Sequence, residues 1–175
     1  MPSVMPTITG QTIQIGRSFL IWMVDQTTER AMDSSRPLVV EFFDQYERSR
    51  NTFDLGVIDS QYPDAFMFAG PNGVRVAEKT AVLAGLAKGQ ELFKTLGHTT
   101  TKLVTLTETT LDQHYTIVRA HFVWHFNKGP TPIAVDVHST FILYITDGVP
   151  KIVFQHEQED FQQALRARGV LPPKT

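Results

Sequence analysis

The sequence contains no cysteine among its 175 residues. Disulfide bonds, thiolate catalysis and zinc sites built on cysteine are therefore excluded. A chain without disulfides suits a reducing compartment, so the sequence favours a cytoplasmic location.

Neither sign of charge dominates the sequence. The 16 basic and 18 acidic side chains leave a net charge of -2, and Lys and Arg do not gather into a run or along one predicted helix. Proteins that bind nucleic acid carry a basic surface that neutralises phosphates. We therefore expect no nucleic-acid partner.

Long apolar runs and glycine-rich loops are also missing. The apolar run near the N-terminus, Phe19–Val24, is far shorter than the roughly 20 residues that cross a bilayer. Asp25 and Gln26 follow it, where a signal peptide would carry small residues. No glycine-rich phosphate loop and no nucleophile elbow is present. We expect no membrane partner and no cofactor.

The composition is that of a globular protein, with 42% hydrophobic and 19% charged residues. A chain of this length forms about one domain. Met32–Ser35 would make a natural start directly before the first helical pattern. We therefore expect residues 1–31 to be an N-terminal extension and residues 32–175 to form a single domain.

Helical and strand patterns follow one another in the first half of the chain. Apolar residues at three and four spacing predict helices, and Gly, Pro, Asn and Asp mark the turns. The predicted elements are a helix over 37–50, a short helix over 52–60, strands over 65–69 and 74–77 around the turn Gly70–Gly73, and a helix over 78–96 that ends at Gly97.

The second half of the chain contains four segments rich in β-branched and aromatic residues. Short turns such as Asp147-Gly148 separate them, which is typical of an antiparallel meander. The fold class is therefore α+β, with one curved sheet and helices on one face. The predicted strands cover 98–109, 114–126, 133–145 and 151–157, and an amphipathic helix over 159–168 closes the chain.

Several short motifs stand at fixed places in this order of elements. They are Tyr62–Ala65, Gly70–Gly73, Val123–Phe126, and Phe141–Gly148 with Lys151–Ile152. Together with the order of elements, they resemble the nuclear transport factor 2-like superfamily, the cone-shaped, cystatin-like fold shared by ketosteroid isomerase and SnoaL-like polyketide cyclases. The likeness covers about residues 37–171 and implies a curved mixed or antiparallel sheet wrapped around about three helices.

Strand alternation predicts which side chains meet in a pocket. A hairpin centred near Pro130 would place Trp124 opposite Asp136 and Phe122 opposite His138. One face would then hold aromatic, acidic and histidine side chains that suit a small apolar ligand. Alternatively, this face is a wet outer surface. The candidate ligand-binding residues are Phe43, Phe122, Trp124, Thr140 and Tyr144, and the candidate catalytic residues are Tyr46, Asp136 and His138.

The resemblance also implies a carboxylate base near the end of the first strand. That place falls on Ala69 or Gly70, which cannot accept a proton. Tyr46 matches the tyrosine of the first helix, and the supporting acid falls near His138 or Thr140. His138 is then the remaining candidate base near neutral pH.

A metal site is not expected from the histidines. His121 and His125 lie four apart on one strand, about 13 Å, which is too far to share an ion. His138 is expected to point to the opposite face from both.

The other face of the same strand is also apolar, with Val135, Val137 and Leu143. A sheet that is apolar on both sides needs both sides covered. We therefore expect a homodimer through this second face, in keeping with the sheet-to-sheet dimers of the resembling family.

Two functions remain open at this point. The chain is a binding protein or a metal-free isomerase- or lyase-type enzyme for a small apolar molecule, or it is a non-catalytic dimerisation or accessory domain. An enclosed pocket with convergent polar groups favours the first, and a cone filled by its own side chains favours the second.

Overall fold

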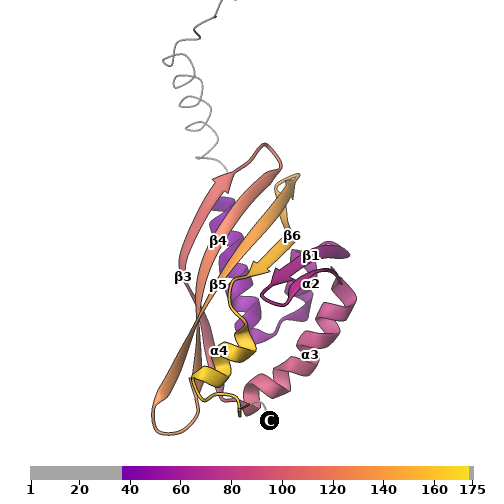
Figure 1. The fold of residues 1–175 in the computed structure, drawn as a ribbon. Coiled ribbons are helices and arrows are strands. Elements are labelled where there is room, and N and C mark those ends of the chain that lie inside the picture. Colours follow the sequence, from indigo (N-terminus) through magenta and orange to yellow (C-terminus); the bar gives the residue numbers. More distant parts are fainter. Residues whose placement is uncertain (1–36, 174–175) are drawn as a thin grey trace, which may run out of the picture.

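The computed structural model describes residues 37–173 (Figure 1). The extension predicted over residues 1–31 lies outside this range. Residues 37–52 are helical, and the later elements are α2 (Leu55–Gln61), β1 (Ala65–Gly70), β2 (Gly73–Glu78), α3 (Lys79–Thr95), β3 (His98–Thr110), β4 (Tyr115–Asn127), β5 (Pro132–Thr146), β6 (Val149–Glu157) and α4 (Phe161–Ala167).

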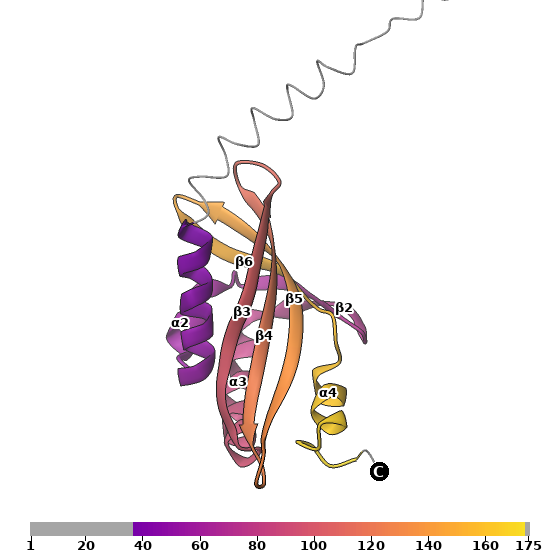
Figure 2. The same cartoon turned by 90° about the vertical axis from the view of Figure 1, so that its left-hand side faces the viewer.

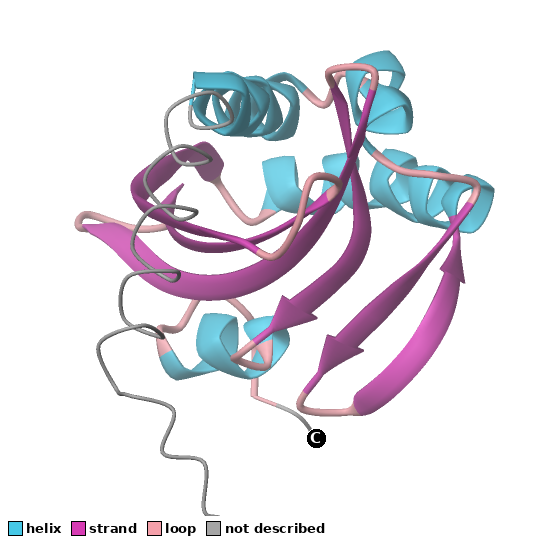
Figure 3. Ribbon diagram, turned by 90° about the horizontal axis from the view of Figure 1, so that it is seen from above, coloured by secondary structure: helices cyan, strands magenta, loops and turns pink. Residues whose placement is uncertain are grey.

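The six strands form one mixed sheet in the order β2-β1-β6-β5-β4-β3. Neighbouring strands are antiparallel except for β1 and β6, which pair in parallel. The long connection that parallel strands need is provided by β2, α3 and the first three strands of the meander. The long strands curve strongly, as the edge-on and top views show (Figures 2 and 3). The predicted α+β fold and the four-stranded meander are confirmed.

The helix over residues 37–52 forms the centre of the core. Its apolar stripe recurs at three and four spacing, so Val39, Phe43 and Tyr46 reach the same side. The Phe43 ring is fully buried and packs 5.1 Å, centroid to centroid, from Phe141 of β5. We call this side of the sheet the concave face, and the opposite side the convex face.

Helix α3 packs more loosely than the first helix. It has no fully buried side chain, and Val82, Leu83 and Leu86 are only partly buried against the main core. This loose packing leaves space between α3 and the sheet.

No helix within residues 37–173 is long and apolar enough to cross a bilayer.

Helix α4 closes the far end of the concave face. Asp160 caps it, because its side chain accepts a hydrogen bond from the backbone N–H of Gln163. Leu165 and Val170 are buried against Phe126 and Val135 in a second apolar cluster.

The hairpin between β4 and β5 differs from the prediction by one residue. Asn127 pairs with Pro132, so Trp124 lies opposite Val135 and Phe122 opposite Val137. A shift of one residue sends every side chain of a strand to the other face. The predicted pairs Trp124–Asp136 and Phe122–His138 are therefore wrong.

Candidate functional site

A cavity of about 320 Å³ lies between the helices and the concave face. Its volume is at the lower end of the range for small-molecule sites. Each layer of the fold contributes to its wall: the 37–52 helix, α2, the β1–β2 hairpin, α3, the meander and the start of α4. The aromatic part of this wall consists of Tyr46, Phe53, Tyr62, Phe66, Phe68, Phe93, Phe122, Trp124 and Phe161.

A chain of hydrogen bonds crosses one side of this apolar cavity. The Arg50 Nη2 group donates to the Tyr62 hydroxyl at 2.9 Å, and that hydroxyl donates to Gln155 Oε1 at 2.8 Å. Gln155 Nε2 donates in turn to Glu157 Oε1, and the Ser139 hydroxyl donates to Glu157 Oε2 at 3.0 Å. All five residues line the cavity. They give it the few placed polar groups that orient a ligand.

Burial controls the ionisation of two groups in this series of hydrogen bonds, Glu157 and Tyr62. Burial raises the pKa of Glu157, although the hydrogen bonds from Gln155 and Ser139 act in the opposite direction. Burial also raises the pKa of Tyr62 well above its ordinary value. The tyrosine therefore stays neutral at physiological pH, and the glutamic acid takes up a proton more readily than an exposed one.

Three of the predicted site residues line the cavity, and the others do not. Tyr46, Phe122 and Trp124 are part of its wall. Phe43 lies behind the wall in the core. The remaining predicted residues alternate along β5 with Val137, Ser139 and Phe141, which lie on the concave face. They therefore lie on the convex face: Asp136, His138, Thr140 and Tyr144.

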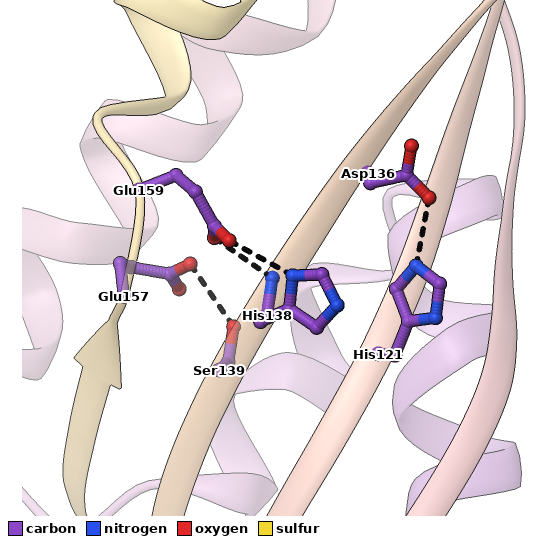
Figure 4. A network of polar contacts seen from close by, with 6 residues as sticks. All are labelled: His121, Asp136, His138, Ser139, Glu157 and Glu159. Atoms are coloured by element: carbon purple, nitrogen blue, oxygen red, sulfur yellow. Dashed lines mark hydrogen bonds and ion pairs between the residues drawn. The ribbon is translucent and has the colours of Figure 1, made fainter.

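His138 and Asp136 therefore take different partners from those predicted (Figure 4). His138 Nδ1 lies 2.8 Å from Glu159 Oε1, and its ring stacks on His121 at 4.4 Å between centroids. Asp136 pairs with His121 Nε2 at 2.8 Å rather than with His138. No cluster of three or more His, Asp or Glu side chains that could hold a metal ion occurs in residues 37–173.

Sequence reasoning missed the polar half of the cavity. Arg50 continues the apolar stripe of the first helix at the same spacing, and this pattern indicates that its side chain points toward the sheet. Glu157 and Gln155 gave no such signal. A bulge between Ile142 and Leu143 shifts the register of β5 and β6, and so turns Gln155 and Glu157 inward opposite Phe141 and Ser139.

No protein-family model matches the sequence, and the search of curated proteins gave no match. Solved structures do resemble it. A nuclear transport factor 2-like protein with a cystatin-like fold from Novosphingobium aromaticivorans has a TM-score of 0.62 and 15% identity, and the match covers 91% of this chain and 99% of that one.

Two further structures show the same architecture. A nuclear transport factor 2-like protein of unknown function from Shewanella oneidensis has a TM-score of 0.56 and 17% identity over 71% of this chain and 98% of that one. A protein of unknown function from Nostoc punctiforme has a TM-score of 0.57 and 9% identity over 72% and 91%. The chain therefore has the nuclear transport factor 2-like, cystatin-like fold that its sequence predicts.

Proposed function

We propose that this protein binds a small, largely apolar molecule in the cavity between its helices and the concave face. The observation that carries the proposal is the convergence of Arg50, Tyr62 and Glu157 on a space walled by aromatic rings. A cone that served only for assembly would fill this space with its own side chains. The cavity thus favours ligand binding over the accessory-domain alternative.

The test uses N-phenyl-1-naphthylamine, a neutral aromatic probe whose fluorescence rises in apolar surroundings. We expect saturable binding to the full chain. Replacing Leu86 with Trp should fill the cavity and weaken binding by about tenfold or more, because the probe then competes with a side chain for the same volume. Trp124→Ala should also weaken it, because Trp124 supplies part of the wall.

Tyr115→Ala is the matched control for Trp124→Ala. Tyr115 is an aromatic residue of the same strand, 39% exposed and outside the cavity. Its loss should leave probe affinity unchanged. Absence of saturable binding to the folded parent chain would contradict the proposed function.

Acid–base chemistry of the isomerase or lyase type is the second candidate, and Glu157 is the observation that favours it. Glu157 is the one carboxylic acid among the lining residues, and burial raises its pKa. Such a group exchanges protons nearer neutral pH than an exposed carboxylate does. His138 does not support this chemistry, because it lies on the other side of the sheet.

We further propose that the protein forms a homodimer, but through other residues than the sequence predicted. Val135, Val137 and Leu143 are buried on the concave face and cannot form an outer contact. The convex face is not covered by either core cluster of the described residues. An apolar row crosses four strands there, and consists of Ile117, Ile142, Phe154 and Met67.

A further inference from the structure

Arg50 places a cation in the largely aromatic wall of the cavity. None of the ion pairs within residues 37–173 includes it. Its Nε is buried and has no hydrogen-bond partner in this part of the chain. Burying an unpaired charge is costly, and buried guanidinium groups are normally paired with an anion.

The position of the guanidinium is fixed by neutral groups. It lies 4.4 Å above the centre of the Tyr46 ring and donates to the Tyr62 hydroxyl at 2.9 Å. These contacts hold the plane of the guanidinium at the cavity wall, but they do not neutralise it. The planar fork of donors remains suited to a carboxylate.

Glu157 is a poor counter-ion for Arg50. Hydrogen bonds link it to Arg50 through Tyr62 and Gln155, and the two charges attract each other, but they are not within ion-pair distance. Glu157 also takes up a proton more readily than usual because it is buried. The cavity therefore has a fixed positive group at one end of its polar chain and a readily protonated acid at the other.

We propose that the ligand of this cavity is an aromatic carboxylate, with its rings among Phe93, Phe122 and Trp124 and its carboxylate paired with Arg50. This inference rests on the proposed function and gives it a substrate class. The aromatic wall accounts for the apolar part of such a molecule, and the unpaired guanidinium accounts for the anion. A neutral aromatic molecule would leave Arg50 as it is now, without a carboxylate in ion-pair contact.

The experiment compares two probes that differ in one group, 2-naphthoate and 2-naphthylmethanol, by calorimetry with the full chain at pH 7.5. We expect the parent protein to bind the carboxylate about tenfold more tightly than the alcohol, since hydrogen bonds to charged groups are worth more than neutral ones. Arg50→Met, which keeps the length and the apolar stem, should abolish this preference and leave affinity for the alcohol within about twofold.

Two other variants test whether a loss of preference for 2-naphthoate comes from the Arg50 guanidinium itself or from a disturbed fold. Arg50→Lys keeps the charge but loses the planar fork, so it should retain only part of the preference for 2-naphthoate. Arg48→Met removes an exposed arginine of the same helix that does not line the cavity. It should leave the preference unchanged, because an exposed cation is already solvated.

The outcomes separate this inference from the proposed function. If the alcohol binds as tightly as the carboxylate, or if Arg50→Met and Arg48→Met lower 2-naphthoate affinity equally, the assignment to Arg50 is wrong while the cavity remains a binding site. If neither probe and no N-phenyl-1-naphthylamine binds the folded parent protein, both the inference and the proposed function are overturned.

Discussion

Glu157 illustrates how a single residue connects stability to the site. Its two carboxylate oxygens accept hydrogen bonds from Gln155 and Ser139, yet burial has the larger effect and raises its pKa. In the window between the ordinary and the raised pKa, the folded state holds more protons than the unfolded chain. The free energy of unfolding therefore falls as pH rises through this window.

Replacing Glu157 with Gln should make the protein more stable at pH 7.5. This gain in stability over the parent protein should become smaller as the pH is lowered toward 4.5. Gln has no charge to bury, and the Ser139 hydroxyl can turn to accept from its amide. Urea unfolding at both pH values measures the effect. Glu91→Gln is the control, because Glu91 is exposed on α3 and should change stability by less than about 0.5 kcal/mol at either pH. A Glu157→Gln protein less stable than the parent at pH 7.5 would contradict this account.

Arg50 and Tyr62 show what a sequence pattern can and cannot predict for single residues. The helical stripe predicted that Tyr46 faces the sheet, and it lines the cavity. The hydrogen bonds of Tyr62 to Arg50 and Gln155 span separations of 12 and 93 residues. No local pattern reports such contacts, because they arise only when the sheet closes around the helices.

At the scale of elements, the end of α3 depends on Gly97. Its φ is +78°, in the left-handed region, and the Asn127 backbone N–H donates to its carbonyl at 2.7 Å. A Cβ at this position would lie 2.3 Å from the Asn127 carbonyl oxygen. Gly97 therefore permits both the turn out of α3 and the close approach of the β4–β5 hairpin.

Gly97→Ala should destabilise the protein by roughly 2 kcal/mol or more, because left-handed strain of about 1–2 kcal/mol adds to a clash with backbone. Gly85→Ala, within α3, is the matched control, since its Cβ would meet nothing within 4 Å. That change should stabilise by about 0.5–1 kcal/mol through helix propensity. Denaturant unfolding of both variants measures the difference, and equal effects would show that the Asn127 contact is not limiting.

The strands and helices themselves were predictable because their signals are local. The predicted helices over 37–50 and 78–96 match the observed 37–52 and 79–95 closely, and the Asp147-Gly148 turn joins β5 and β6 as expected. Strand register was not predictable in the same way. Register depends on the length of the loop between Asn127 and Pro132 and on the bulge between Ile142 and Leu143. The predicted pairing of β4 with β5 was off by one residue, and this placed Asp136 and His138 on the wrong face of the sheet.

At the scale of the whole molecule, the two faces of the sheet carry different sets of side chains. The concave face carries the core and the cavity, whereas the convex face combines an apolar row with the stacked pair His121–His138. In the row, Ile142 lies between Ile117 on β4 and Phe154 on β6, and Met67 of β1 continues it with 46% exposure. A second copy of the same sheet would cover this row symmetrically.

Light scattering at micromolar concentration should therefore give twice the monomer mass for the parent protein. Ile142→Glu should release folded monomers, because a two-fold contact would bring both introduced carboxylates into one apolar interface without partners. Ala87→Glu introduces the same charge on an exposed position of α3 and should leave the dimer intact. Circular dichroism would establish that both variants are folded. A monomeric parent protein would rule out the dimer, and a dimeric Ile142→Glu variant would place its interface away from the convex face.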